Sequence, residues 1–160
     1  MRVDDGSEAA TLLDESSTEL QDSLDELREL ARGLHPVVLT DRGLPAAVRI
    51  LADRAPVPVT ISALPAERLP APVETAVYFV VAEALTNVAK YAHASTATVA
   101  ITTNANLVAV EVSDDGSGGA DISGGSGLRG LADRVAALDG RLELHSPSGG
   151  GTRLRAEIPL

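Results

Sequence analysis

The longest amphipathic pattern in the chain runs from Pro72 to His93. Its apolar residues recur at steps of three and four, which places them on one face of a helix: Val73, Val77, Val80, Val81, Ala84, Leu85 and Val88. Pro72 suits the first turn, where its missing N–H removes no hydrogen bond. Glu83, Asn87 and Lys90 stand at i, i+4 and i+7 and form a polar stripe beside the apolar face. An acid, an amide and a base aligned in this way suit a metal ion and a phosphate, although an ordinary solvated helix edge has the same composition.

A second apolar repeat lies in a helix that we expect from Leu13 to Leu34. Its seam has a 4-3-4-3 spacing and consists of Leu20, Leu24, Leu27, Ala31 and Leu34. This spacing is typical of a coiled coil or helical bundle, and a short helix of this kind is only marginally stable alone. We therefore expect it to pair with another chain or with a helix outside this one; packing onto its own domain is the alternative. Gly33 and Pro36 end the helix, because Pro36 restricts His35.

The remaining patterns predict two helices and five short strands. The helices are expected at Leu44 to Arg54 and Leu128 to Asp139, and the strands at Val57 to Ser62, Ala97 to Thr102, Leu107 to Val112, Arg141 to Ser146 and Thr152 to Pro159. Pro56 and Pro58 indicate that the first strand lies at a sheet edge, and Gly140 is the expected stop of the last helix. The element order predicts an α+β fold in which helices cover one face of a mixed, mainly antiparallel sheet.

Composition narrows the class of protein. The chain has 160 residues, which is long enough for one domain with a core. It contains no cysteine, so neither a disulfide framework nor a thiolate metal site is possible. No apolar run reaches the length of a membrane helix, and no signal peptide opens the chain. These features favour a cytoplasmic protein or the soluble portion of a longer one, whose membrane attachment stays open.

Charge is unevenly distributed along the chain. Residues 1–30 contain ten acids and two bases, whereas the other 130 residues contain 13 acids and 11 bases. Nucleic acid is a poor partner for such a surface, because nothing offsets the repulsion of its phosphates. The second part of the chain is close enough to neutral for a few placed cations to hold a nucleotide.

Residues 113–130 form a segment with seven glycines. A loop of this length in a compact domain is usually functional or disordered. Gly125 to Gly130 matches Gly-x-Gly-x-x-Gly, but a dinucleotide fingerprint should directly follow a strand and have an acid about 20 residues on, where this chain has Gly150. A general anion site remains, formed by glycine N–H groups and the start of the next helix; a flexible linker is the alternative. The histidines show no Ser-His-Asp order or His-x-x-x-His pair.

Four segments together resemble the ATP-binding domain of two-component sensor histidine kinases. They resemble its N box (Glu83 to His93), its first glycine box (Asp114 to Gly118), its second (Gly125 to Leu131) and its terminal one (Gly149 to Thr152). Leu34 to Ala47 looks like the junction of the subfamily that pairs with response regulators of the LuxR/NarL type. The resemblance covers about residues 20–160 and implies the Bergerat or GHKL fold, a two-layer α/β sandwich, here preceded by one coiled-coil-like helix.

The resemblance implies ATP and Mg²⁺ as ligands. Asn87 would bind Mg²⁺, a hard cation that prefers oxygen ligands and phosphate, and Glu83 would orient a metal-bound water. Lys90, His93 and Arg129 would contact phosphate oxygens. In this reading the N box holds the metal and the phosphates.

By the same resemblance, Asp114 would accept a hydrogen bond from the adenine amino group, with Thr152 in support. Gly116 and Gly118 would leave room for the base. The lid over the triphosphate would consist of Gly125, Gly127, Leu128 and Gly130.

The implied activity is transfer of the γ-phosphate of ATP to a histidine. The family's acceptor histidine lies mid-helix before an acid, and neither His35, His93 nor His145 fits that description. We therefore expect a fragment that holds a partial dimerisation helix in residues 1–40 and the ATP-binding catalytic domain in residues 41–160. It should bind ATP without phosphorylating itself, and the full-length protein should be a homodimer that works with a LuxR/NarL-type response regulator. The alternatives are a non-enzymatic, ATP-gated interaction module and a serine kinase of the anti-sigma-factor type.

Overall fold

The computed structural model describes residues 37–122 and 126–160. Three predictions lie outside the described residues: the helix from Leu13 to Leu34 with its coiled-coil seam, the helix end at His35 and Pro36, and Gly125 of the lid. Within the described ranges, no helix combines the length and the apolar character needed to cross a membrane.

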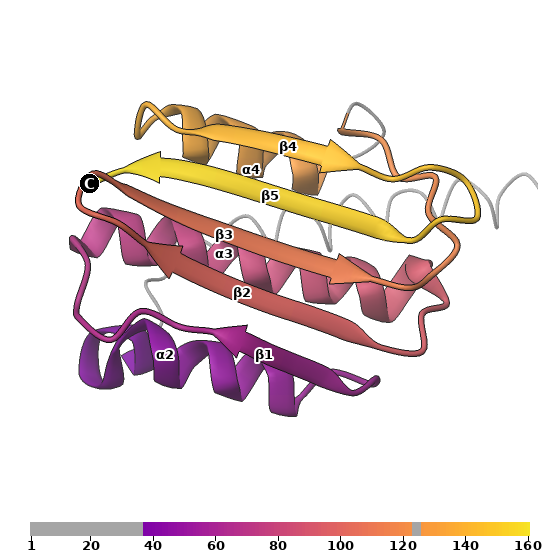
Figure 1. Cartoon of the computed structure of the whole chain (residues 1–160), viewed down its shortest axis with the longest axis horizontal. Helices are drawn as coiled ribbons and strands as arrows, with labels where there is room; N and C mark the ends of the chain where they lie inside the picture. Colours follow the sequence, from indigo (N-terminus) through magenta and orange to yellow (C-terminus); the bar gives the residue numbers. More distant parts are fainter. Residues whose placement is uncertain (1–36, 123–125) are drawn as a thin grey trace, which may run out of the picture. The chain divides into compact units, whose positions relative to one another are not determined.

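The described chain forms one five-stranded sheet with helices on one of its faces (Figure 1). In chain order the elements are α2 (Val37–Asp53), β1 (Val59–Ala63), α3 (Ala71–Asn87), the π-helix η1 (Val88–Ala92), β2 (Ala97–Thr103), β3 (Leu107–Asp114), α4 (Ser126–Ala136), β4 (Arg141–His145) and β5 (Thr152–Pro159). The strand order is β1-β2-β3-β5-β4. Among the described residues, β1 and β2 pair in parallel and the other three strand pairs are antiparallel. The predicted α+β fold and the edge position of the first strand are therefore confirmed.

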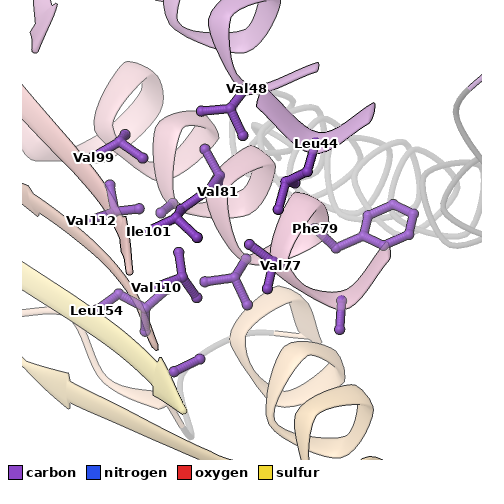
Figure 2. Packing of buried hydrophobic residues seen from close by; sticks show 14 of the residues in the cluster. Leu44, Val48, Val77, Phe79, Val81, Val99, Ile101, Val110, Val112 and Leu154 are labelled. Carbon is purple, nitrogen blue, oxygen red and sulfur yellow. The ribbon is translucent and has the colours of Figure 1, made fainter. Parts of the chain in front are cut away.

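The core lies between the sheet and α3. Alternate residues of β2, β3 and β5 turn toward the helix (Figure 2), and the most buried of them are Val99, Ile101, Val108, Val110, Ala156 and Ile158. All seven residues of the predicted apolar face of the central helix, six in α3 and Val88 in η1, are buried. Because burial of one aliphatic side chain stabilises the fold by about 1.5–3 kcal/mol, this face fixes the rotation of α3 about its axis and so determines where Glu83 and Asn87 point.

The central helix departs from the prediction at its C-terminal end. We expected one α-helix as far as His93, but after Asn87 the chain continues as the π-helix η1. Hydrogen bonds in a π-helix run from i to i+5, so the 100° step per residue no longer holds. Lys90 therefore leaves the straight stripe that Glu83 and Asn87 define. His93 ends the element in the left-handed conformation, with φ 50°.

The helix before β1 is longer than predicted. It begins at Val37 rather than Leu44, and it is kinked at Gly43, which has φ 77° and ψ 173°. Pro45 does lie in the first turn of the part after the kink, as predicted. The helical residues before Gly43 were not predicted, because Pro45 is itself typical of the start of a helix. The first strand begins at Val59 rather than Val57.

The last helix also begins and ends differently from the prediction. It begins at Ser126, not Leu128, and its regular turns end at Ala136. The left-handed residue after it is Asp139, with φ 55°. Gly140, the expected stop, follows Asp139 and donates its N–H to the Val135 carbonyl over 3.0 Å. This bond from beyond a left-handed residue is the signature of a Schellman cap.

Candidate functional site

The adenine-site residues of the prediction lie side by side where β3 ends and β5 begins, at the right-hand end of the sheet in Figure 1. Asp114 is the last residue of β3, and its partner across the ladder is Thr152, the first residue of β5. Asp114 Oδ1 accepts a hydrogen bond from the Gly116 N–H over 2.9 Å. The hydroxyls of Thr152 and Ser146 lie 2.9 Å apart and share a hydrogen bond. Each side chain is thus held in place by a short-range contact.

The first glycine box is joined to the terminal one by backbone hydrogen bonds. The Gly151 N–H donates to the Gly116 carbonyl over 2.9 Å, and the Gly149 N–H donates to the Ser117 carbonyl over 2.6 Å. Gly118 has φ 63°, and a Cβ there would collide with the Pro147 carbonyl. A side chain would therefore be both strained and blocked at this position. The two glycine-rich turns form one backbone platform beside Asp114 and Thr152.

The same platform contacts the end of the central helix. The Ser117 N–H donates to the Ala92 carbonyl over 2.7 Å. A Cβ on Gly116 would collide with that carbonyl, so the approach of the two segments requires glycine. Ala92 is the last residue of η1 and lies between Lys90 and His93. The structure therefore brings the first glycine box to the residues that were expected to contact phosphate.

Asp115 adds a link that the sequence analysis did not identify. Its Oδ1 accepts hydrogen bonds from the N–H groups of Ser95 and Thr96, at 2.7 Å and 2.9 Å. These two backbone donors hold the pKa of the exposed Asp115 carboxyl below its usual value, because they stabilise the charged form. The Thr96 N–H has the larger effect and the Ser95 N–H the smaller one. No sequence signal could have found this link, since both donors are backbone groups.

The second glycine box meets the N box at the start of α4. Gly127 lies against the Glu83 carboxylate: a Cβ on Gly127 would collide with Oε1 and lie 2.8 Å from Cδ. Leu128 is half-buried and packs on the core, Arg129 is exposed, and Gly130 is half-buried. The predicted helix begins at Leu128 and therefore includes Gly130; the observed α4 also includes Gly127, which was predicted to lie in the loop. The helix thus begins two residues earlier than predicted, at Ser126, and its Gly127 lies against Glu83 of α3.

The central helix presents an oxygen-rich pair. Glu83 and Asn87 are both half-buried and one turn apart on α3. A carboxylate and a carboxamide oxygen are the ligand types that Mg²⁺ prefers, and this ion commonly binds one or two protein oxygens together with substrate phosphates and water. Among residues 37–122 and 126–160, no group of three or more His, Cys, Asp and Glu could hold a metal ion. The donor set on α3 fits Mg²⁺ bound together with a phosphate.

Two candidate phosphate contacts lie beyond this pair. Lys90 and His93 are exposed, and in the described part of the chain neither side chain takes part in a hydrogen bond or ion pair. An ammonium and an imidazole that are not engaged by protein acceptors can bind an anion. Ala92 lies between these two residues in the chain, and its hydrogen bond to the Ser117 N–H brings them next to the platform.

The chain matches a known family model and several known proteins. The family model described as "Histidine kinase-, DNA gyrase B-, and HSP90-like ATPase" matches residues 73–160. The sensor histidine kinase MctS of Rhizobium johnstonii is 35% identical over 168 residues, which cover 98% of this chain and 36% of that protein. The oxygen sensor histidine kinase NreB of Staphylococcus carnosus is 35% identical over 146 residues, which cover 86% of this chain and 42% of that protein. The chain thus spans about two fifths or less of the length of these curated relatives.

A solved structure has a similar fold. The blue-light activated histidine kinase of Erythrobacter litoralis EL346 superimposes with a TM-score of 0.63 at 24% sequence identity, over 74% of this chain and 41% of that one. The histidine kinase domain of the same protein superimposes with a TM-score of 0.59 over 58% of its length. At this identity the similarity concerns the fold alone.

Proposed function

The chain belongs to the family of histidine kinase-, DNA gyrase B- and HSP90-like ATPases, and from this premise we propose that residues 41–160 form the catalytic, ATP-binding domain of a sensor histidine kinase. One observation carries the proposal beyond family membership. The Ser117 N–H to Ala92 carbonyl bond joins the first glycine box to the end of the N box. A nucleotide with its base at one segment and its phosphates at the other would therefore span a short and fixed distance.

In this proposal the adenine lies against Asp114. One oxygen of that carboxylate accepts the Gly116 N–H, and the second is the acceptor for the adenine amino group. Thr152 supports the base from the neighbouring strand. Gly116 and Gly118 keep side chains out of the space between the platform and the base.

Asn87 and Glu83 would hold Mg²⁺, Asn87 as a direct ligand and Glu83 through a metal-bound water. When bound, Mg²⁺ would neutralise charge on the phosphate oxygens. Lys90, His93 and Arg129 would contact the phosphates directly. In phosphoryl transfer the protein acts mainly through positioning and charge neutralisation, and these residue types are suited to both.

The start of α4 would close over the triphosphate. Gly127 and Gly130 allow the backbone to approach closely, and the N–H groups of a helix N-terminus favour an anion. Leu128 anchors this turn on the core. Gly125, which lies outside the described residues, would belong to the same lid.

The reaction that we propose moves the γ-phosphoryl group of ATP to a ring nitrogen of a histidine on a dimerisation helix. A P–O bond breaks, a P–N bond forms at the unprotonated ring nitrogen, the other ring nitrogen releases its proton to solvent, and ADP leaves. The acceptor histidine would lie outside this chain, and the full-length protein would be a cytoplasmic or membrane-attached homodimer. Its phosphohistidine would be the phosphoryl donor for a response regulator of the LuxR/NarL type.

Phosphate transfer in trans tests this proposal. The chain is mixed with γ-labelled ATP, Mg²⁺ and a sensor-kinase dimerisation fragment that carries the acceptor histidine; a His→Gln version of the fragment and the Asn87→Ala chain serve as controls. We expect acid-labile label on the fragment, absent in both controls. ATP binding without any transfer would contradict the kinase proposal and favour an ATP-gated interaction module. Absence of ATP binding would contradict both.

A further inference from the structure

Asp115 connects the two ends of the candidate nucleotide site. On one side it follows Asp114 directly. On the other, its carboxylate accepts the N–H groups of Ser95 and Thr96, which lie just after His93. The Asp115 N–H also points to the Thr96 carbonyl, at 3.4 Å. Three hydrogen bonds therefore tie the segment that leaves η1 to the first glycine box.

These hydrogen bonds lie at the end of the β2–β3 ladder. Ala97 and Asp114 are partners in the β2–β3 ladder. The bonds from Asp115 to Ser95 and Thr96 extend that ladder beyond its last pair, into the turn that leads back to η1. The donors are backbone N–H groups and the acceptor is ionised, so these hydrogen bonds are of the stronger, charge-assisted kind.

We propose that Asp115 is a positioning residue of the nucleotide site, which sets the distance between Asp114 and the phosphate contacts Lys90 and His93 without touching the nucleotide itself. This inference rests on the proposed function. It follows from the chain path, because the two segments that Asp115 joins carry the proposed adenine contact and the proposed phosphate contacts. Misplacement of a binding group by about 1 Å can cost as much as 10²-fold in rate. A variable distance between the two segments should therefore weaken the function of the site measurably.

A second connection lets the role of Asp115 be isolated. Ser117 and Gly116 contact Ala92 independently of the Asp115 side chain. Loss of the carboxylate should therefore loosen the spacing while the platform stays folded. A residue that fixes a spacing affects a ligand that reaches both ends, but not a ligand that reaches only one.

The experiment uses the whole chain with Asp115→Ala, Asp115→Asn and the control Asp53→Ala, an exposed acid of α2 that forms no ion pair in the described part of the chain. Dissociation constants are measured for ATP, for adenosine and for tripolyphosphate, with Mg²⁺ present. We expect Asp115→Ala to weaken ATP binding about tenfold and to leave adenosine and tripolyphosphate within about twofold. Asp115→Asn should retain ATP binding to within about threefold, because its amide oxygen can accept both N–H groups. The control should match the wild type.

Three results would overturn the inference: unchanged ATP binding in Asp115→Ala, a loss that adenosine or tripolyphosphate shows to the same extent, or no rescue by Asp115→Asn. If Asp115→Ala does not fold, Asp115→Glu replaces it, and its longer arm should produce the same split between ATP and the single-ended ligands. The two proposals fail in different ways. Wild-type chain that does not bind ATP contradicts the proposed function, whereas ATP binding that is equal in wild type and Asp115→Ala contradicts only the inference.

Discussion

The carboxylate of Glu74 and the guanidinium of Arg68 form a two-point ion pair, with both N–O distances at 2.9 Å. The Glu74 side chain is only 2% exposed, whereas that of Arg68 is 58% exposed. The Leu69 N–H also donates to Glu74, over 3.2 Å, and Arg68 Nη2 reaches the Leu39 carbonyl of α2 at 3.4 Å. The loop before the central helix is therefore fastened both to α3 and to α2.

Removal of Arg68 should destabilise the domain. Arg68→Ala leaves the buried Glu74 carboxylate with a backbone N–H as its remaining donor, and we expect the free energy of unfolding to fall by about 2–3 kcal/mol. This is below the usual 3–5 kcal/mol for a buried pair, because water reaches the exposed guanidinium and already screens the pair. Urea denaturation measures the change, with the exposed Arg54→Ala as the control. The double variant Arg68→Ala, Glu74→Leu should regain part of the loss, and a loss from Arg68→Ala no larger than that of the control would contradict this account.

Gly116→Ala should damage both stability and nucleotide binding. The new Cβ would meet the backbone carbonyl of Ala92, which cannot rotate away. Overpacking of this kind typically costs about 1–3 kcal/mol, and relief requires the glycine platform to move away from η1. Thermal unfolding and ATP titration of the same preparation check both effects. Wild-type stability would show that the two segments are not in close contact.

Gly127→Ala is the matched comparison, with the opposite expectation for stability. Its Cβ would meet the tip of the flexible Glu83 side chain, which can swing aside at little cost. Because alanine also favours the helix, unfolding should change by less than about 1 kcal/mol. Displacement of Glu83 should nevertheless weaken the Mg²⁺-dependent part of ATP binding. A large loss of stability, or unaltered Mg²⁺ dependence, would show that Glu83 does not have the proposed position.

The sequence predicted well those features that depend on periodic burial. One side of α3, β2, β3 and β5 is buried in the core. Apolar residues therefore recur at helical or alternating spacing along these elements, and that spacing is visible in the sequence alone. The ends of elements were predicted less well. Nothing in residues 88–92 distinguishes a π-helix from an α-helix, and Gly127 is predicted to lie in a loop although in the structure it lets α4 lie close to Glu83.

Contacts between distant polar groups were the least accessible to sequence analysis. Glu74 is an acid in the first turn of a helix, where acids are common for electrostatic reasons alone, so its burial against Arg68 had no signal. Asp115 binds backbone N–H groups, which every residue possesses. The residue-by-residue roles in the nucleotide site, such as those of Asn87 and Lys90, stay predictions.

The Asp115 contact should give a stability term that depends on pH. The pKa of Asp115 in the folded state lies below the ordinary value of 3.8. The ionised carboxylate therefore stabilises the fold fully at pH values above the pKa that Asp115 has in the unfolded chain. This contribution should be lost as the pH falls through the lower folded-state pKa. The difference in free energy of unfolding between wild type and Asp115→Asn should therefore be constant near neutral pH and shrink below about pH 4. Urea denaturation across this range measures it, and a difference that grows on acidification would contradict the assigned direction.

Calorimetric titration with a non-hydrolysable ATP analogue, with and without Mg²⁺, tests the central claim most directly. The wild-type chain should bind the analogue, and Mg²⁺ should tighten binding. Asp114→Ala should weaken binding about tenfold or more in both conditions, because the half-buried acceptor for the base is lost. Asn87→Ala should remove mainly the Mg²⁺-dependent gain. Wild-type binding that neither substitution changes, or no binding at all, would contradict a nucleotide site between the central helix and the glycine platform.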